Sequence, residues 1–321
     1  MIRSTLSEFG GPEVLRVETA PDPVPDAREI AIAVHASGVN RADLLQRAGH
    51  YPPPPGEPSW PGLEVAGTVV SAGDAVSRWR PGDRVCALLA GGGYATRVAV
   101  HEDLVLPAPD GLTWEEAGGL VEAACTAWSN LETADARAGE TLLVEGGSGG
   151  VGHIAVQLGV ALGMRVLATA GGTHRAERVA ALGAEAIDHT SGDVAEQVRE
   201  RGGVDVILDV LGAGALDPHL RMLNPDGRLV VIGMQSGRRG ELDLGRLLST
   251  RARVIGTTLR ARPHEQKARI VREVEQHVWP HVPERIRPVV HEAYPLDRAG
   301  DAHRALDSGE VFGKLVLTPP A

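Results

Sequence analysis

The first 120 residues combine short alternating patterns with dense glycine and proline turns. Residues 29–35 (EIAIAVH) alternate with the period of two that is typical of a half-buried strand. Residues 65–70, 85–89 and 94–100 follow the same pattern, and the last of these comes directly after three consecutive glycines. We therefore expect this part of the chain to be mostly strand and turn.

From Thr113 onward the pattern becomes helical, and Thr113 with Glu116 forms a capping box at the start of the first helix. Strands and helices then alternate. The predicted strands are 142–144, 165–170, 185–188, 204–210, 229–232 and 253–258, and the predicted helices between them include 173–182, 193–201, 215–223 and 242–249. Six strands with interleaved helices predict an α/β fold with a doubly wound parallel sheet.

A glycine-rich loop follows the first of these strands. Gly147, Gly149 and Gly152 satisfy the pattern G-x-G-x-x-G, and an amphipathic helix begins directly after them. Glycine allows the tight turn and lets the backbone approach a pyrophosphate, while the helix N-terminus offers free N–H groups to the phosphates. An ordinary glycine-rich turn is the alternative, but the strand–loop–helix context favours dinucleotide binding.

The last 60 residues are too few to fold alone. They predict a polar helix at 264–278, a second helix at 296–306 and an apolar strand at 315–317. We expect this segment to return to the first domain. The expected boundaries are 1–121 for a catalytic domain, 122–261 for the Rossmann dinucleotide-binding domain and 262–321 for the returning segment.

Composition excludes several classes of function. The formal net charge of −10 leaves no basic surface for nucleic acid or for an anionic membrane. No apolar run approaches the ~20 residues of a membrane span, and the first residues lack the apolar core of a signal peptide. The two cysteines, Cys86 and Cys125, are too few for a disulfide framework. These features predict a soluble cytoplasmic protein.

The segment after the second strand of the sheet favours NADPH over NADH. Sheets that bind NAD usually place a carboxylate there for the ribose 2′-hydroxyl. Here no carboxylate occurs before Glu177, and Arg175 is available to pair with a 2′-phosphate. The alternative is that Arg175 is an ordinary solvated helix residue.

The sequence does not supply the ligands of a catalytic zinc ion. Leu63 stands where a ligand imidazole is expected, Cys86 and Cys125 are far apart in the chain, and no H-E-x-x-H pair occurs. We therefore expect a metal-free protein in which Cys86 is a small apolar residue of a strand. Hydride transfer without a Lewis acid suits quinones and conjugated enones rather than simple alcohols or ketones.

Four consecutive prolines follow Tyr51 and predict a stiff, extended loop. This loop either forms a fixed wall of a substrate cleft or is a rigid surface connector, and the sequence does not decide between them.

Five motifs occur in an order that spans the whole chain. They are G-V-N-R-A-D at 38–43, P-G-L-E at 61–64, G-G-G-Y-A at 91–95, the glycine loop, and F-G-K-L-V-L at 312–317. Together they resemble the zinc-free quinone oxidoreductases, the zeta-crystallin-like branch of the medium-chain dehydrogenase/reductase superfamily. The resemblance implies a GroES-like, mostly-β catalytic domain built from both chain ends, a Rossmann domain between them, and a homodimer.

The resemblance also implies roles for individual residues. Tyr51 would form a wall of the quinone pocket, Asn40 would lie near the nicotinamide ribose, and Asp43 would stabilise its loop or border the cleft. The implied cofactor-binding set is Asn40, Thr126, Ser148, Gly149, Gly150, Val151, Gly171, Thr173, Arg175, His189, Met234, Gln235, Leu259, Arg260 and Lys314. The family usually has Tyr where His189 stands and Lys where Arg175 stands.

The resulting hypothesis is a zinc-independent NADPH:quinone oxidoreductase. No residue is an evident general acid, so the hydroquinone oxygen is expected to take its proton from water, with Tyr51 as the one nearby phenol. The nearest alternative is an NADPH-dependent reductase of the C=C bond of 2-alkenals or enones. An alternative of another class is an NADPH-binding structural or RNA-binding protein, although the net charge of −10 argues against RNA.

Overall fold

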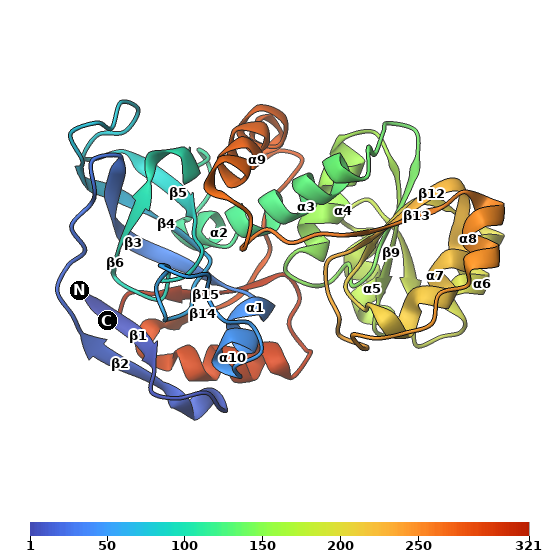
Figure 1. Cartoon of the computed structure of the whole chain (residues 1–321), viewed down its shortest axis with the longest axis horizontal. Helices are drawn as coiled ribbons and strands as arrows, with labels where there is room; N and C mark the ends of the chain where they lie inside the picture. The colour runs from blue at the N-terminus through green and yellow to red at the C-terminus, as the bar shows by residue number, and fades with distance from the viewer. Residues whose placement is uncertain (321) are drawn as a thin grey trace. The chain divides into compact units, whose positions relative to one another are not determined.

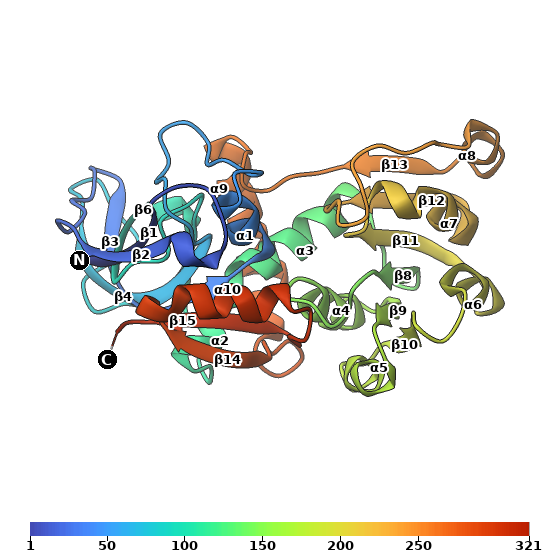
Figure 2. The same cartoon turned by 90° about the horizontal axis from the view of Figure 1, so that it is seen from below.

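The computed structural model describes residues 1–320, and the chain divides into two compact units (Figures 1 and 2). Unit 1 comprises Met1–Cys125 and Arg260–Ala321, and unit 2 comprises Thr126–Leu259. Within residues 1–320 there is no helix of the length and apolarity needed to cross a membrane. The expected boundaries of independently folding domains stay a prediction.

Unit 2 contains a six-stranded parallel sheet in the order β10-β9-β8-β11-β12-β13. The strands are β8 (Thr141–Val144), β9 (Arg165–Ala170), β10 (Glu185–Asp188), β11 (Val204–Asp209), β12 (Leu223–Val231) and β13 (Arg253–Gly256). The helices are α4 (Gly152–Ala161), α5 (Thr173–Ala180), α6 (Val194–Glu200), α7 (Leu216–Met222) and α8 (Leu244–Thr250). Figure 2 shows α4 on one side of the sheet and α6 and α7 on the other.

The core of unit 2 follows from the apolar strands that the sequence predicts. Leu143, Leu167, Ile207 and Leu229 come from four neighbouring strands and are fully buried in one cluster. Strands that are covered by helices on both faces must be apolar on both faces, which is why these segments are continuous apolar runs. The predicted parallel doubly wound sheet is confirmed.

Unit 1 contains a seven-stranded sheet and a separate two-stranded ribbon. The strands are β1 (Ile2–Leu6), β2 (Leu15–Thr19), β3 (Glu29–Val39), β4 (Glu64–Ala72), β5 (Arg84–Leu88), β6 (Arg97–His101), β7 (Val105–Pro107), β14 (Val290–Pro295) and β15 (Lys314–Thr318). The helices are α1 (Arg41–Arg47), α2 (Trp114–Gly118), α9 (His264–His277) and α10 (Ala299–Asp307), and α3 (Val121–Thr133) crosses the boundary between the units.

The returning C-terminal segment completes the sheet of unit 1. β15 pairs antiparallel with β3, with Leu315 opposite Val39 and Leu317 opposite Ser37, and β14 pairs with the other side of β15. Leu315 and Leu317 are buried in a cluster that also contains Val39 and Tyr94. The two chain ends therefore share one core.

Some elements differ from the sequence prediction. The helical stretch after Thr113 is broken at residues 119–120 into α2 and α3. Gly118, the last residue of α2, packs so closely on Ala36 that a β-carbon there would lie 2.7 Å from the Ala36 Cβ. The seven-residue helix α1 and the β1–β2 ribbon were not predicted. Asn40 and Asp43 form a capping box at α1, so an Asn-x-x-Asp spacing was the available signal for this helix.

Candidate functional site

Most of the predicted cofactor residues of unit 2 follow the carboxyl ends of its strands. Ser148, Gly149, Gly150 and Val151 lie after β8, Gly171, Thr173 and Arg175 after β9, His189 after β10, Met234 and Gln235 after β12, and Leu259 after β13. Because the strands are parallel, these ends share one edge of the sheet. β8 and β11 are adjacent but not consecutive, and open α/β sheets bind ligands at the carboxyl edge beside such a switch point.

The glycines of the loop after β8 have different structural roles. A β-carbon at Gly152 would collide with the carbonyl oxygen of Gly146, and one at Gly147 would lie 2.8 Å from the Ala168 Cβ. A β-carbon at Gly149 would meet only the Gly146 carbonyl oxygen, at 3.3 Å. Gly147 and Gly152 are therefore required by internal packing, whereas few protein atoms surround the Cβ position of Gly149.

A buried polar cluster anchors the start of this loop. The Gly146 N–H donates to Thr169 Oγ1 at 2.9 Å, and the Thr169 hydroxyl donates to Glu145 Oε2 at 2.6 Å. His219 Nε2 lies 3.0 Å from Glu145 Oε1, and His219 Nδ1 lies 3.7 Å from Asp209 Oδ2. Sequence reasoning missed this cluster, whose members come from four separate segments.

Asp209 closes β11 and holds the chain beyond it. Its carboxylate accepts hydrogen bonds from the N–H groups of Leu211, at 2.6 Å, and Gly212, at 3.0 Å. Burial raises the pKa of the Asp209 carboxyl above its usual value, and the nearby His219 and these two amides partly oppose the shift. The cluster thus links the carboxyl ends of β8 and β11, the two strands that flank the switch point.

The segment after β9 contains Gly171, Thr173 and Arg175 of the predicted cofactor-binding set, and His189, which follows β10, lies beside it. A β-carbon added at Gly171 would lie 3.1 Å from His189 Nε2 and 3.8 Å from an Arg175 guanidinium nitrogen. The side chains of His189 and Arg175 therefore both flank Gly171. Thr173, the first residue of α5, is exposed beside them.

Asp188 is a carboxylate of this loop region that sequence reasoning missed. Its Oδ1 accepts hydrogen bonds from the N–H groups of Gly172 and Thr190, both at 2.9 Å, and from the Thr190 hydroxyl at 2.6 Å. The hydrogen bonds from Thr190 lower the pKa of Asp188 most strongly. Asp188 therefore acts as the acceptor that fixes the turn before α5.

Four predicted cofactor residues of unit 2, three of them at the carboxyl edge described above, have few informative contacts. Thr126 is in α3, where its carbonyl oxygen accepts from Asn130 Nδ2 at 2.6 Å. Met234 and Gln235 are exposed, and Leu259 is half-buried. These positions do not assign a function by themselves, so the cofactor role of the four residues stays a prediction.

In unit 1 the structure joins Asn40 to Lys314 through a residue that was not predicted, Glu64. Lys314 Nζ donates to Asn40 Oδ1 and to Glu64 Oε1, both at 2.6 Å, and Asn40 Nδ2 donates to Glu64 Oε1 at 3.0 Å. The side chains of Lys314 and Glu64 are 1% and 0% exposed. The second carboxylate oxygen of Glu64 accepts from the Glu122 N–H at 3.0 Å.

This buried triad fixes the orientation of the Asn40 amide. The ammonium can only donate and the carboxylate can only accept, so the Asn40 oxygen faces Lys314 and its nitrogen faces Glu64. Glu64 is the last residue of the P-G-L-E motif, of which only Leu63 was interpreted from the sequence.

Asp43 lies at the end of a second buried network. Its carboxylate accepts from the N–H groups of Asn40, at 2.8 Å, and Gly62, at 2.9 Å, and from the Tyr94 hydroxyl at 3.3 Å. The residue is fully buried, and desolvation raises its pKa to about 6 against the opposing effect of the two amides. Asp43 therefore holds the backbone at Asn40 and Gly62, and its role in the reaction stays a prediction.

The network continues from Tyr94 to His303 and Arg47. The Tyr94 oxygen lies 2.9 Å from His303 Nε2, and an Arg47 guanidinium nitrogen lies 3.3 Å from His303 Nδ1. Since Arg47 can only donate, Nδ1 accepts and Nε2 carries the proton that reaches Tyr94. Burial, reinforced by Arg47, lowers the pKa of His303 to about 3, so this ring is neutral.

Tyr51 and Arg260 are also neighbours in unit 1. The Arg260 guanidinium carbon lies 5.2 Å from the centre of the Tyr51 ring, and the same group donates to the Tyr51 carbonyl oxygen at 3.2 Å. Arg260 further donates to Gln46 Oε1 at 2.7 Å and to the Ala90 carbonyl oxygen at 2.6 Å. These bonds hold the start of the proline loop against α1.

Leu63, which stands where a ligand imidazole is expected, and the two cysteines are all buried. Leu63 is buried, and Cys86 is fully buried in β5 with its thiol donating to the Ala117 carbonyl oxygen at 3.6 Å. Cys125 is fully buried in α3. Burial raises the pKa of both thiols above the usual value of a cysteine.

Two family models match the chain. The model described as the alcohol dehydrogenase GroES-like domain matches residues 26–110, and the model described as zinc-binding dehydrogenase matches residues 150–276. The α/β fold with a Rossmann sheet and a GroES-like β domain is confirmed.

Similar proteins extend over almost the entire chain. The quinone oxidoreductase of Mus musculus is 34% identical over 325 residues, which cover 97% of this chain and 95% of the mouse protein. The quinone oxidoreductase structure of Thermus thermophilus, determined also in complex with NADPH, is 34% identical with a TM-score of 0.85, covering 99% of this chain and 100% of that one.

The Escherichia coli quinone oxidoreductase in complex with NADPH is 28% identical with a TM-score of 0.89, and the match covers 99% of this chain and 100% of that one. Identity above 30% over nearly the full length confirms the resemblance drawn from the five motifs. The chain belongs to the quinone oxidoreductase (zeta-crystallin-like) branch of the medium-chain dehydrogenase/reductase superfamily and is an NAD(P)H oxidoreductase of that family.

Proposed function

We propose that this chain is a zinc-independent oxidoreductase that uses NADPH to reduce quinones and works as a homodimer. When bound, the nicotinamide supplies the hydride from its C4 atom. The chain's own residues bind and orient the reactants, which is a contribution worth about 7–11 kcal/mol in well-oriented reactions. Hydride and one proton from water convert the quinone to the hydroquinone anion and then to the hydroquinone.

The observation that carries the cofactor proposal is the arrangement around Gly171. His189 and Arg175 flank this glycine, and Asp188, the nearest carboxylate described above, is already bonded to two backbone amides and a hydroxyl. A guanidinium group pairs well with a phosphate. The arrangement supports a 2′-phosphate on the adenosine ribose and therefore NADPH.

Two features of the glycine loop support binding of the pyrophosphate. The space outside Gly149 admits close approach of a ligand to the backbone, and Gly146 is held through Thr169 to the buried Glu145. A loop that is fixed before the ligand arrives loses little entropy on binding. Ser148, Gly150 and Val151 belong to the same turn, and we assign them to the pyrophosphate with Gly149.

In unit 1 we assign Asn40 to the nicotinamide end and Tyr51 to the quinone. Lys314 and Glu64 hold the Asn40 amide in one orientation, so Lys314 serves as a positioning residue. The Tyr51 ring is held by Arg260 and precedes four prolines, so it can stack on a planar substrate with little loss of entropy. Leu63, a buried apolar residue where a ligand imidazole is expected, supports a reaction without catalytic zinc.

The cofactor assignment is tested by titrating NADPH and NADH, followed by fluorescence, against three proteins. The wild type should bind NADPH more tightly than NADH. Arg175→Ala should weaken NADPH binding by roughly 10- to 150-fold, because a charge-assisted hydrogen bond contributes about 1.5–3 kcal/mol, and should leave NADH binding unchanged. The matched control Arg178→Ala, one turn along α5, should keep the preference. Equal binding of both nucleotides by the wild type would refute the assignment.

The substrate assignment is tested by steady-state kinetics with a panel of quinones and a panel of 2-alkenals. Tyr51→Ala should lower kcat/KM for aromatic quinones several-fold to about tenfold, which is the effect expected from the loss of one stacking interaction. Tyr51→Phe keeps the ring and should leave kcat/KM unchanged. A Tyr51→Phe variant as impaired as Tyr51→Ala would assign the proton to the phenol instead of water. Turnover of 2-alkenals but not quinones would replace the proposal by the C=C reductase.

The dimer proposal rests on the exposed edge of unit 2. Within residues 1–320, β13 pairs only with β12 and so ends the sheet, and Val254 on it is 39% exposed. Leu244 and Leu248 of the neighbouring α8 are 62% and 76% exposed. Light scattering should give a dimer for the wild type and a monomer for Leu248→Glu, whereas Val24→Glu, a change at an exposed apolar residue of unit 1, should stay dimeric. A wild type that is monomeric in solution would overturn the dimer proposal.

A further inference from the structure

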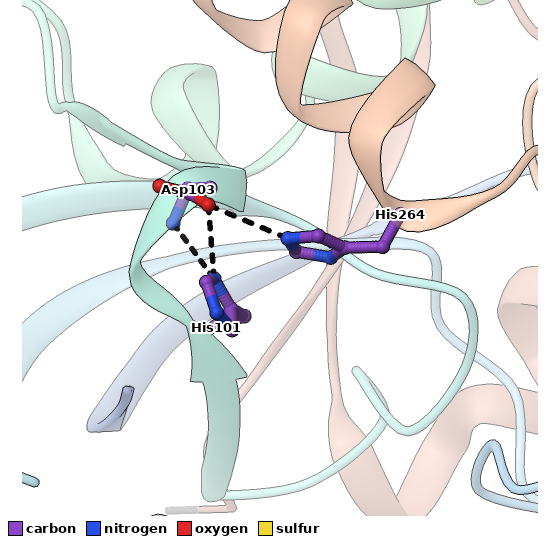
Figure 3. A group of neighbouring side chains, drawn as sticks. All are labelled: His101, Asp103 and His264. Atoms are coloured by element: carbon purple, nitrogen blue, oxygen red, sulfur yellow. Dashed lines mark hydrogen bonds and ion pairs between the residues drawn. The ribbon is translucent and has the colours of Figure 1, made fainter. Parts of the chain in front are cut away.

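Three potential metal ligands gather on the surface of unit 1. His101 is the last residue of β6, Asp103 lies in the 3-10 helix Glu102–Leu104, and His264 is the first residue of α9 (Figure 3). Their side chains are 26%, 34% and 42% exposed, so a dissolved ion can reach them. None of the three belongs to the machinery described above, and the proposal below does not depend on it.

We propose that His101, Asp103 and His264 bind a divalent transition-metal ion, zinc above all. Asp103 Oδ2 lies 3.5 Å from His101 Nδ1 and 3.4 Å from His264 Nε2, and one ligand atom from each residue lies within 4.8 Å of the other two. Ligand bonds of about 2.0–2.1 Å in a tetrahedron place the ligand atoms about 3.3–3.4 Å apart. The two distances to Asp103 match this spacing before any ion arrives.

The ligand types select the class of ion. Two imidazoles and one carboxylate suit Zn²⁺, Ni²⁺ or Cu²⁺, whereas Ca²⁺ and Mg²⁺ prefer shells of oxygen atoms. Arg28 lies 3.8 Å from the other carboxylate oxygen of Asp103, which further disfavours an ion that needs several carboxylates. The exposed side of the cluster leaves the fourth position to water.

The metal would replace weak contacts between the side chains. The Asp103 N–H donates to His101 Nδ1 at 3.2 Å, and this half-exposed amide can donate to water instead. The rings of His101 and His264 lie edge to face with their centres 4.3 Å apart. Burial is the main cause that lowers the pKa of His101, and the nearby His264 adds to it. The lowered pKa favours the neutral ring that a metal requires.

A bound ion would join two segments that are distant in the sequence. Asp103 and His264 are 161 positions apart, and the link would tie the start of α9 to the end of β6. An ion that binds the folded state alone stabilises that state in proportion to the logarithm of its concentration. The bound ion would therefore be a reversible cross-link between β6 and α9 within unit 1.

The test is a titration of the chelator-treated full-length protein with Zn²⁺, followed by calorimetry. We expect one ion per chain, with a dissociation constant on the order of micromolar. His264→Ala and Asp103→Asn should each weaken binding at least about tenfold, and bound Co²⁺ should show the visible absorption of a tetrahedral site that is lost in His264→Ala. Zn²⁺ should also raise the Tm of the wild type but not that of His264→Ala.

The matched control is His277→Ala, which removes an exposed histidine from the other end of the same helix. This variant should bind Zn²⁺ as the wild type does. Equal Zn²⁺ affinity for His264→Ala and the wild type would overturn the proposal, as would a loss of affinity in His277→Ala or no binding at millimolar Zn²⁺. Circular dichroism of each variant without metal shows that a loss of binding is not a loss of fold.

Discussion

Replacement of Lys314 by methionine should destabilise unit 1 strongly. Methionine keeps much of the length and volume of lysine but removes the ammonium that donates to Asn40 and Glu64 at 2.6 Å. The Glu64 carboxylate, 0% exposed, would then keep only the Asn40 amide and the Glu122 N–H as donors. Breaking a buried ion pair from one side costs about 3–5 kcal/mol, because the remaining charge is left without compensation.

The assay is thermal unfolding followed by circular dichroism, together with a double-mutant cycle. At about 2–4 °C per kcal/mol for a unit of this size, Lys314→Met should lower the Tm by roughly 6–20 °C. Glu64→Gln should cost a similar amount because it leaves the ammonium unpaired. The double variant should be no less stable than either single variant, since it removes both charges at once.

The chain's other lysine provides the control. Lys267 Nζ lies 3.9 Å from a carboxylate oxygen of Glu57, which is 36% exposed, and such partly exposed pairs contribute about 0–1 kcal/mol. Lys267→Met should therefore shift the Tm by no more than a few degrees. A Lys314→Met variant that melts with the wild type, or a double variant that sums the two single losses, would show that the buried triad does not work as a coupled unit.

Four further predictions follow from the geometry. Asp43 has a pKa of about 6 in the folded protein and about 4 in the unfolded chain. Protonated Asp43 therefore adds about 3 kcal/mol to the free energy of unfolding below pH 4, and this contribution is lost as the pH rises through 6. Measurement of the free energy of unfolding between pH 4 and 7 for the wild type and Asp43→Asn checks this. Ellman's reagent should label neither Cys86 nor Cys125 in the native protein and both in denaturant, because burial raises the pKa of each thiol; rapid native labelling contradicts this. Gly149→Val should keep a native circular dichroism spectrum and lose NADPH binding, whereas Gly152→Ala should lower the Tm because its β-carbon meets the Gly146 carbonyl. Quinone reduction should persist in an excess of a strong chelator, and elemental analysis that links activity to zinc would refute a metal-free reaction.

The sheet of unit 2 was predictable because its signals are local. The strand bounds Arg165–Ala170 and Glu185–Asp188 agree with the sequence prediction to the residue. Buried parallel strands are apolar runs, and glycine marks the turns between strand and helix, so each element is readable without knowledge of its neighbours. The Asp193 cap of α6 was likewise within the expected helix start.

The polar networks were not predictable because their partners are distant in the chain. Glu64 and Lys314 are 250 positions apart, and Tyr94 and His303 are 209 apart. A single sequence gives no measure of which distant polar residues meet, so Lys314 was assigned to the cofactor and its buried carboxylate partner was overlooked. The β1–β2 ribbon was missed for another reason, since β2 is mostly exposed and its apolar alternation is limited to Leu15 and Val17.

The position of β15 sets the order in which the two units can be completed during synthesis. Unit 2 is one continuous segment, whereas residues 37–39 of β3 wait for their partner β15 until Thr318 has been translated. At about 5–20 residues per second, the edge of β3 that β15 covers stays open for roughly 15–60 s after Val39 is made. During this time residues 37–39 of β3 present an unpaired edge to other chains, and a stop codon just before β15 would leave that edge unpaired.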